Sequence, residues 1–541
     1  MGQLSRRAVL GGGALGALGV LGGTAACGSN QTRVPTARGS RSPRPAHAST
    51  LVRDENQAAG TQGWMRTADG TKPNQDALGQ VSAFASKSSY TAGERITFYL
   101  STARRQDCTV AVHRLGHYRG AGGRLLTTSP RLAASPQAAP VISDTTGEIS
   151  CPWDASWSLE VPTTWLSGLY LATVTTADGH RTAVPFAVRD DRPSDFLVVL
   201  PFTTYQAYNT YPVDGRTGKS LYYGFVQGDR AAIGTQTSPD GHTYPVSRMP
   251  DSPFWWHYPH RARTVSFRRP YSDDGLPKFF ELDQAFVFWA ESQGLDVSYA
   301  SSLDLHEGRV DLSRYAGLLF SGHDEYWSQE MRTAAESAVA KGASLAYLGG
   351  NSVYWKIRAG VDQAGFSTVT CYKSDPDPAD DGTGATRKWR DVAAKHRSAE
   401  QVLLGSQYQA VVLKRTPLVV SEAKHWLWTG TGLAEGDRLP DVVAGEADGV
   451  TAKMPGPSGT TEHTLLSTSP FPCAEGTLVQ NTSLYQARSG AWVFNAGTFG
   501  WTPALGWNPT LHSSATPAWT SVTTDPHIQR ATRNLLDRLR T

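Results

Sequence analysis

The pattern of apolar and polar residues changes character about one third of the way along the chain. Between residues 81 and 188, short stretches alternate or run apolar, and Gly, Asp, Pro and Ser residues separate them. Short strand-like stretches at this spacing are typical of a β-sandwich. A charged, proline-containing segment, residues 189–196, follows. We therefore predict an Ig-like β-sandwich over residues 76–190 and a different fold beyond it.

After residue 190, strand patterns alternate with helix patterns. Apolar runs predict buried strands at residues 196–201, 295–301, 315–320, 343–350 and 491–505, and amphipathic stretches predict helices at residues 279–294, 328–342 and 525–539. Strands that alternate with helices need crossover connections, which build a mostly parallel sheet covered on both faces. We predict a doubly wound α/β domain over residues 191–541, flavodoxin-like or amidotransferase-like, with insertions near residues 224–261 and 360–480.

The N-terminal residues have the pattern of a targeting signal. Arg6 and Arg7 precede a weakly apolar Gly/Ala/Leu region that ends in small residues before Cys27, which resembles a twin-arginine export signal over residues 1–27. "TAAC" resembles a lipobox with Thr24 in place of the usual Leu, and it equally suits ordinary signal-peptidase cleavage. We expect an exported protein, either a lipoprotein on the outer face of the cytoplasmic membrane or a secreted one.

Residues 28–75 follow this signal and lack hydrophobic periodicity over most of their length. Their Ser, Thr, Arg, Pro and Ala content is typical of a flexible tether. A lipid on Cys27 is the one membrane contact that we expect.

Cysteine content suggests structural disulfides. Cys27 belongs to the signal, which leaves four cysteines, an even number in an exported chain. Cys108 with Cys151 and Cys371 with Cys473 would each lie within one predicted domain. The chain has no Cys-x-x-Cys pair and no Cys beside a His, so zinc binding and thiol catalysis are disfavoured.

Composition and charge exclude further classes. The chain has 541 residues, of which 18% are charged, and a formal net charge of +3. This length predicts two to three domains. No Lys/Arg block is interleaved with aromatic residues, so nucleic acid is not an expected partner. No Gly-x-Ser-x-Gly motif occurs, which disfavours a serine hydrolase.

Polar residues capable of proton transfer or metal binding follow three of the predicted strands. In parallel sheets, ligands gather at the carboxyl ends of the strands, so these residues are expected to converge on one pocket. They are Tyr205, Tyr208 and Asn209 after the first strand, His323, Asp324, Glu325 and Tyr326 after residues 315–320, and Asn351 after residues 343–350.

Several longer motifs resemble one known family. "TTYQAYN", "GKSLYYG", "VSFRRPY", "GHDEYWS" and "LGGNSVYWKIR" resemble the motif series of the N,N-dimethylformamidase large (beta) subunit family. "RLGHYRGAGG", "CPWDASW" and "SGLYLA" resemble the sandwich domain that precedes it in exported bacterial members. The resemblance extends from about residue 80 to the end of the chain.

This resemblance implies a mononuclear ferric iron, Fe(III), that is held by two tyrosinates and one glutamate and serves amide hydrolysis. Matched motif by motif, the metal ligands would be Tyr208, Tyr271 and Glu325, with His323 and Asn351 beside the metal as catalytic residues. Two positions stay open at this point. Tyr205 competes with Tyr208, and Tyr244 and Tyr258 compete with Tyr271.

The residues of such a site have chemistry suited to a trivalent ion and to amide hydrolysis. Phenolate and carboxylate are hard anionic donors, and three of them would neutralise a trivalent ion while leaving coordination positions open. An open position supplies a Lewis acid for an amide carbonyl or for water. His323 would carry a proton between water and the leaving amine, and Asn351 would donate a hydrogen bond to the developing oxyanion.

Simpler roles exist for the same residues. Tyr208 and Tyr271 would also fit as buried aromatic residues with satisfied hydroxyl groups. Glu325 would fit as a helix cap or as the ion-pair partner of Arg268, Arg269 or Arg358. Asp324 would fit on a loop surface.

We therefore expect an exported, metal-dependent hydrolase of an amide or related C–N bond in a small or amino-linked substrate. Two alternatives stay open: a non-catalytic cell-surface protein that binds glycan or wall fragments, and a metal-independent carboxylate/His carbohydrate-active enzyme. The sequence does not decide between a small partner subunit and a homo-oligomer.

Overall fold

The computed structural model of the protein describes residues 49–227, 235–237, 243–245, 254–257, 260–380, 384–506 and 522–541. The predicted export signal, the lipid site at Cys27 and most of the predicted insertion near residues 224–261 lie outside these ranges. No helix within the described ranges is long and apolar enough to cross a membrane.

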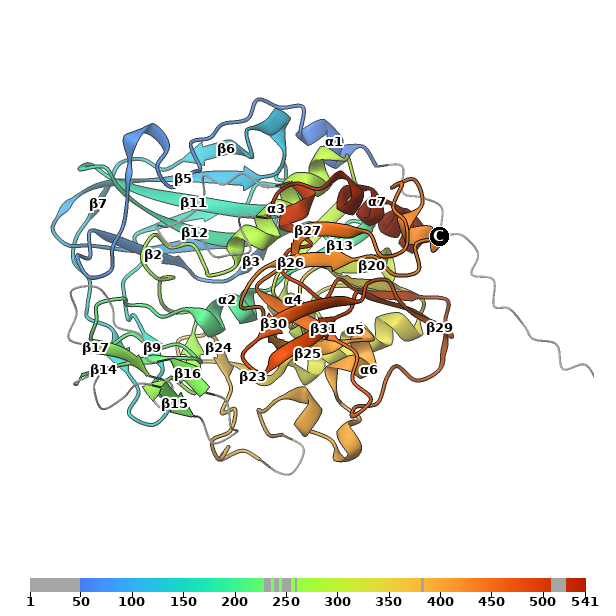
Figure 1. The fold of residues 1–541 in the computed structure, drawn as a ribbon. Helices are drawn as coiled ribbons and strands as arrows, with labels where there is room; N and C mark the ends of the chain where they lie inside the picture. Colours follow the sequence, from blue (N-terminus) through green and yellow to red (C-terminus); the bar gives the residue numbers. More distant parts are fainter. Residues whose placement is uncertain are drawn as a thin grey trace, which may run out of the picture. The chain divides into compact units, whose positions relative to one another are not determined.

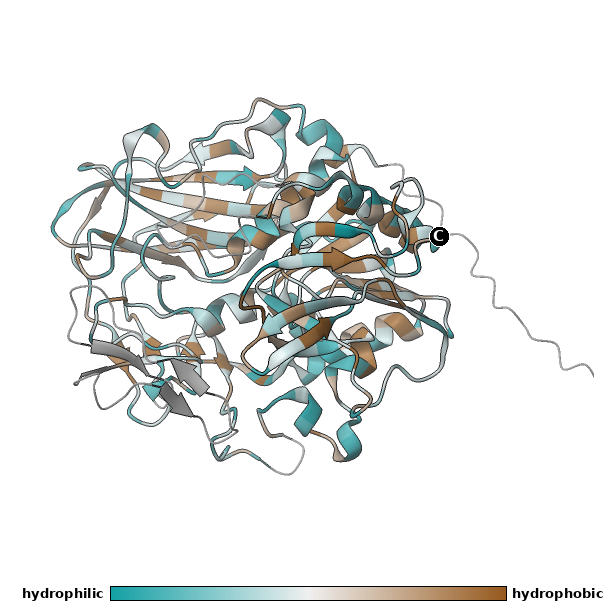
Figure 2. Cartoon of the chain, in the orientation of Figure 1, coloured by the Kyte–Doolittle hydropathy of each residue, from teal (hydrophilic) through white to brown (hydrophobic). Residues whose placement is uncertain are grey.

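The region predicted as a sandwich consists of two sheets around a shared core. Along β4 (Arg95–Thr102), every second residue is buried, which places Ile96, Phe98 and Leu100 on the inner face. They pack with Val112 and Tyr170 from the other sheet. Figure 2 shows apolar residues concentrated along these strands. The sheets contain β10 (Trp157–Glu160), β4 (Arg95–Thr102) and β2 (Val81–Ala85) on one side, and β12 (His180–Arg189), β11 (Gly168–Thr176), β5 (Gln106–Leu115) and β6 (Gly123–Thr128) on the other.

A seven-stranded mixed sheet organises the second part of the chain. Its strand order is β19-β13-β20-β22-β33-β32-β29. The first five strands pair in parallel, and the last two are antiparallel. The strands are β19 (Val297–Ser301), β13 (Ser194–Leu200), β20 (Tyr315–Phe320), β22 (Ser344–Tyr347), β33 (Trp492–Asn495), β32 (Ser483–Ala487) and β29 (Thr460–Leu465).

Both faces of this sheet are buried. Phe196, Val198 and Leu200 of β13 join one core cluster, which includes residues of α3 (Phe280–Ser292) and α7 (Pro526–Arg540). Leu197 and Val199 join a second cluster with residues of α4 (Ser302–His306) and α5 (Gln329–Ala340). Because successive strand residues point to opposite faces, the helices cover both sides of the sheet (Figure 1).

Most predicted strands and helices of this part are confirmed, but the strand predicted at residues 491–505 is limited to β33, and the finer fold prediction is not supported. Two antiparallel strands extend the sheet, and many short strands lie outside it, so β structure dominates over a few helices instead of the regular alternation of a flavodoxin-like or amidotransferase-like domain. The additional strands include β18 (Thr264–Ser266), β24 (Ser367–Thr370), β23 (Trp355–Val361), β25 (Gln407–Val411), β26 (Thr416–Val419), β27 (Arg438–Val443), β30 (Ser469–Cys473) and β31 (Gly476–Gln480).

Two predicted boundaries differ from the structure. Residues 28–75 are not a tether at their C-terminal end, since α1 (Leu51–Glu55) forms there and Val52 and Trp64 are each only 1% exposed. The predicted insertion over residues 360–480 supplies core residues such as Leu418 and Val442. Both segments lack a clear hydrophobic period, which explains why their burial is hard to predict.

The predicted disulfides are absent from the structure. Cys108, Cys151, Cys371 and Cys473 are all buried free thiols. Cys108 and Cys151 belong to separate core clusters, so they act there as small apolar residues.

A buried ion pair joins the sandwich to α3. Arg114 of β5 donates two hydrogen bonds to Glu291 of α3, at 2.8 and 2.9 Å, and neither side chain is more than 1% exposed. Glu291 also accepts from Asn56 and Tyr299. Since a buried carboxylate needs all of these partners, the sandwich and α3 depend on each other.

We expect Arg114→Met to lower the free energy of unfolding by about 3–5 kcal/mol, because it leaves the buried Glu291 carboxylate without its cation. Urea denaturation of the purified protein measures this loss. Arg104→Met, in the exposed pair with Asp178, is the matched control and should change the free energy by less than about 1 kcal/mol. Equal effects of the two variants would contradict this account of the interface.

Candidate active site

Four of the polar residues predicted to converge, Tyr208, His323, Glu325 and Asn351, lie together at the carboxyl ends of the parallel strands. Tyr208 ends α2 (Phe202–Tyr208), which directly follows β13. His323 and Glu325 lie between β20 and β21 (Tyr326–Ser328). Asn351 follows β22 by four residues. The strand ends thus bring four of the expected residues to one polar centre, whereas Tyr205 and Asn209 bond to other partners.

Glu325 is the centre of this cluster. Tyr208 donates its hydroxyl to Oε2 of Glu325 at 2.7 Å, and Tyr222 donates to Oε1 at 2.6 Å. The Nδ2 of Asn351 lies 3.3 Å from Oε1, and the Nε2 of His323 lies 3.3 Å from Oε2. Both carboxylate oxygens are therefore engaged, and the Glu325 side chain is 0% exposed. The two phenol rings stack at 4.6 Å.

His323 points one ring nitrogen at the acidic groups and fixes the other. Its Nδ1 lies 3.1 Å from the carbonyl oxygen of Gly350, which only a protonated Nδ1 can satisfy. Its Nε2 faces Glu325 and lies 3.9 Å from Oε2 of Glu446. His323 is thus oriented to hold or release a proton at Nε2.

Glu446 is a site residue that the sequence analysis misses. It begins β28 (Glu446–Gly449), and its Oε2 accepts a hydrogen bond from Nδ2 of Asn351 at 2.7 Å. The segment "VVAGEADG" gives a usable signal, because carboxylates placed among small and apolar residues are costly to bury in a strand. It lies more than 90 residues beyond Asn351, so no local motif links the two.

Of the two tyrosines expected as ligands, Tyr208 lies beside Glu325 and Tyr271 does not. Tyr208, and not Tyr205, reaches Glu325; Tyr205 donates instead to Asp283 at 2.6 Å. The hydroxyl of Tyr271 has no hydrogen-bond partner among the described residues, and Tyr222 occupies the place beside Glu325 that the motif comparison gave to Tyr271. The side chains of Tyr244 and Tyr258 lie outside the described part. Tyr222 lies in "GKSLYYG", a motif from which the sequence analysis takes no ligand.

The simpler roles considered for the acidic residues do not fit. Arg358 pairs with Asp377, and Arg269 donates to the backbone carbonyls of Asn209 and Lys219, so neither is the partner of Glu325. Asp324 is 1% exposed and not on a loop surface. Burial raises its pKa to about 8.

Burial and neighbouring charge control the proton affinity of the centre. Burial, together with the charge of Glu325, raises the pKa of Tyr208 and of Tyr222 well above the ordinary value. Burial likewise raises the pKa of Glu446. For His323, burial acts to lower the pKa, but the hydrogen bond to Glu325 and the charge of Glu446 outweigh it and raise the pKa. Without a cation between them, the two phenols therefore stay protonated.

The donor set fits a hard cation that prefers oxygen. No group of three or more His, Cys, Asp or Glu side chains in the described ranges is arranged to hold a metal ion. A metal at this centre would instead rely on the phenol oxygens of Tyr208 and Tyr222 together with Glu325. The buried Oδ1 of Asn351 lacks a hydrogen-bond partner among the described residues, which leaves an acceptor beside the centre. These observations agree with a mononuclear ion held by phenolate and carboxylate.

A second layer holds the loop that carries His323 and Glu325. Asp283 of α3 accepts hydrogen bonds from Tyr205 and Ser321, each at 2.6 Å. Gly322 packs so closely on Asp283 that any β-carbon there would overlap its carboxylate. Burial raises the pKa of Asp283 to about 7. The carboxyl group of Asp283, on α3, therefore holds this loop in place.

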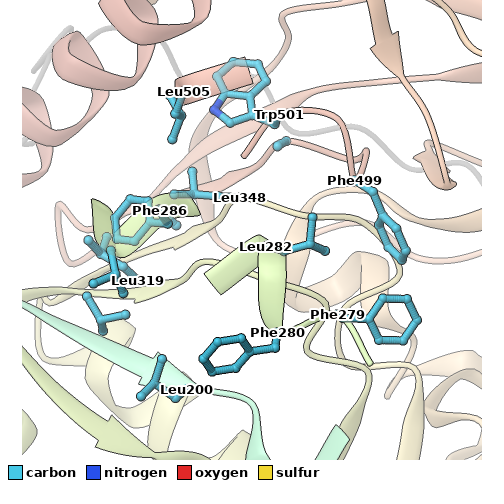
Figure 3. Close-up of a cluster of buried hydrophobic side chains, with 14 of the residues drawn as sticks. Leu200, Phe279, Phe280, Leu282, Phe286, Leu319, Leu348, Phe499, Trp501 and Leu505 are labelled. Atoms are coloured by element: carbon cyan, nitrogen blue, oxygen red, sulfur yellow. The ribbon is translucent and has the colours of Figure 1, made fainter. Parts of the chain in front are cut away.

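Aromatic and cationic side chains surround the centre. Phe279 and Phe499 each lie 4.7 Å from the His323 ring, and Figure 3 shows them facing each other at one side of the apolar cluster. The ammonium group of Lys373 lies 3.3 Å from the centre of the Tyr222 ring, and that of Lys278 lies 4.8 Å from the centre of the Tyr208 ring. The polar centre thus has an apolar wall and two nearby cations.

The protein combines a mixed β-sheet with helices on both faces, an associated β-sandwich, and a buried cluster of phenol and carboxylate groups at the strand ends. A family described as N,N-dimethylformamidase beta subunit-like, C-terminal, matches residues 109–515. The chain belongs to this family. The matched range includes all of the clustered residues and confirms the family resemblance inferred from the motifs.

Individual relatives are more distant. The N,N-dimethylformamidase beta subunit of Paracoccus aminophilus is 23% identical over 436 residues, which cover 71% of this chain and 54% of that protein. The chain thus spans about half the length of this curated relative. Among solved structures, a cycloisomaltooligosaccharide glucanotransferase of Paenibacillus sp. aligns over 63% of this chain and 61% of its own, with 10% identity and a TM-score of 0.15. A likeness this weak supports no conclusion.

We expect Gly322→Ala to lower the free energy of unfolding by about 1–3 kcal/mol, because the new β-carbon overlaps Asp283 and displaces the loop. Thermal unfolding and near-UV circular dichroism measure the stability and the packing of the site aromatics. Gly456→Ala is the control, since nothing lies within 4 Å of a β-carbon there. An unchanged melting temperature for Gly322→Ala would contradict the tight packing of this loop.

Proposed function

We propose that the protein is an exported, metal-dependent hydrolase that cleaves an amide or a related C–N bond. One observation carries the proposal: two phenol hydroxyls and one carboxylate meet in a buried centre, beside an oriented histidine. Membership of the N,N-dimethylformamidase beta subunit-like family supports hydrolase chemistry of this kind. Export rests on the twin-arginine pattern of residues 1–27.

The proposed cofactor is a single ferric ion held by Tyr208, Tyr222 and Glu325. When bound, such an ion supplies a Lewis acid for a carbonyl oxygen and for water. Tyr222 replaces Tyr271 in this ligand set, because Tyr222 is the second phenol that reaches Glu325. Tyr271 instead lies near Arg269 and Tyr205, close enough to act on the pKa of each in the upward direction.

His323 and Glu446 are suited to move the protons of hydrolysis. Attack of water on an amide requires removal of one proton, and departure of the amine requires delivery of one. With Nδ1 held by Gly350, His323 exchanges its proton at Nε2, which faces Glu446. The Nδ2 of Asn351 donates to both Glu446 and Glu325 and thereby offsets the repulsion between the two carboxylates. Phe279 and Phe499 exclude water from the other side of the His323 ring.

We further propose that the protein works in an assembly of more than one subunit. The curated relative is named a beta subunit, which supports a multi-subunit assembly. A small partner subunit and a homo-oligomer both agree with that name, and mass measurement of the purified mature protein distinguishes them.

The mature protein, expressed with ample iron, should contain about one iron per chain and show a broad visible absorption band from iron–phenolate charge transfer. Tyr208→Phe and Tyr222→Phe should each weaken the band, and Glu325→Gln should lower the iron content. Tyr271→Phe is the matched control and should leave band and iron content unchanged. Elemental analysis and absorption spectra measure both quantities. Iron-free, colourless protein, or loss of the band with Tyr271→Phe only, would contradict this ligand set.

Glu446→Gln should lower kcat by about 10²- to 10⁴-fold while the iron content stays at the wild-type level, because Glu446 transfers protons and is not a ligand. Release of amine from a panel of small amides measures kcat. Glu475→Gln, an exposed position, is the control and should retain full activity. Loss of iron in Glu446→Gln would show instead that this carboxylate belongs to the metal ligands.

A further inference from the structure

The turn that follows β22 contacts three side chains of the centre. The carbonyl oxygen of Gly350 accepts a hydrogen bond from Nδ1 of His323 at 3.1 Å. One residue further on, the Nδ2 of Asn351 lies 2.7 Å from Glu446 and 3.3 Å from Glu325. The position of this turn therefore decides where His323 directs its Nε2 and where Asn351 donates.

The backbone of this turn needs support from its surroundings. Asn351 and Val353 have φ angles of +50° and +55°, in the left-handed region, which asparagine tolerates and β-branched valine does not. Gly350 packs closely on β28, since a β-carbon there would lie 2.8 Å from the backbone oxygen of Glu446. A strained backbone of this kind persists only where neighbouring contacts fix it.

Asp448 of β28 provides such a contact. Its Oδ1 accepts the backbone N–H of Asn351 at 2.8 Å, and its Oδ2 accepts from Nδ2 of Asn495 at 2.9 Å. Asp448 and Asn495 are both 0% exposed. Glu446 and Asp448 are two residues apart on one strand, so their side chains leave it on the same face. One strand thus presents a carboxyl group to the side chain of Asn351 and another to its backbone.

The orientation of the Asn495 amide is fixed. Its Oδ1 accepts the N–H of Gly497 at 3.2 Å, and its Nδ2 donates to Oγ of Ser406 at 3.0 Å as well as to Asp448. Turning this amide over would place its Nδ2 against the N–H of Gly497. Position 448 therefore requires two acceptor oxygens, which aspartate has and asparagine lacks.

We propose that Asp448 is a positioning residue for hydrolysis, which holds the turn after β22 and, through this turn, the His323 ring and the Asn351 side chain. This inference rests on the proposed function and adds a residue to it. The two oxygens of Asp448 are occupied by the backbone of Asn351 and by Asn495. Asp448 thus acts on the centre by way of the turn, and its loss should disturb proton transfer more than iron binding.

Asp448→Asn tests this inference together with a reciprocal exchange, Asp448→Asn combined with Asn495→Asp. In the single variant, the new amide group meets a donor either at Asn351 or at Asn495. In the exchange, the new carboxylate accepts from the new amide, so that every donor regains an acceptor. Asp448→Asn should lower kcat for an amide that the protein cleaves by about 10- to 100-fold, while KM and iron content change little. The exchange should restore most of kcat.

A second readout needs neither iron nor substrate. Nuclear magnetic resonance of the full chain, expressed without iron and with isotope-labelled histidine, should show a slowly exchanging imidazole N–H from the bond of His323 to Gly350. The absence of this signal in His323→Gln assigns it. Asp448→Asn should weaken the signal, and the exchange should restore it. Asp144→Asn, the same change at an exposed aspartate, is the control and should alter neither kcat nor the signal.

Unchanged kcat and an unchanged N–H signal in Asp448→Asn would overturn the inference, as would an exchange that restores neither. If Asp448→Asn does not fold, the exchange decides: we expect it to fold with the signal and kcat retained, and failure to fold or loss of both overturns the inference. If the wild-type protein cleaves no amide, the proposed hydrolysis falls, and the N–H signal still decides whether Asp448 positions His323.

Discussion

The arrangement around the centre depends on one constraint, which is that the carboxylate of Glu325 is wholly buried. A buried charge is stable only where every lone pair has a partner, and here four side chains from four segments of the chain supply them. The same requirement draws α2, the loop after β20 and the residues after β22 to one point. The oxygen atoms that gather around Glu325 are hard donors and lie close together. The arrangement that stabilises the buried charge is therefore also suited to bind a cation.

Support for this centre extends outward in layers. Asp283 holds the loop of His323 from below, and Asp283 belongs to α3. The same helix carries Glu291 at its other end, where Arg114 of the sandwich binds it. A single helix of 13 residues thus links the polar centre to the β-sandwich. Through this helix, the sandwich helps to hold the polar centre in position.

Parts of this arrangement follow from the sequence, and others do not. The strand at residues 315–320 and the helix after Ser328 are predicted correctly, because period and capping are local signals. Tyr208, His323, Glu325 and Asn351 are brought together as expected, since parallel strands end at one edge. Tyr222 and Glu446 are not foreseen, because neither follows a strand of the parallel sheet directly, and Glu446 lies in no motif linked to the others. The disulfide prediction fails because an even cysteine count carries no information on distance.

The ion pair between Arg114 and Glu291 has a consequence for how the chain can be divided. A boundary near residue 190 looks natural in sequence, yet the apolar cluster on the α3 side of the sheet also contains Leu115, Leu171 and Trp64. A fragment that began after this boundary would expose that surface and leave a charge unpaired. The two parts therefore form one cooperative unit, and residue 190 marks a change of fold and not a point at which the chain can be divided.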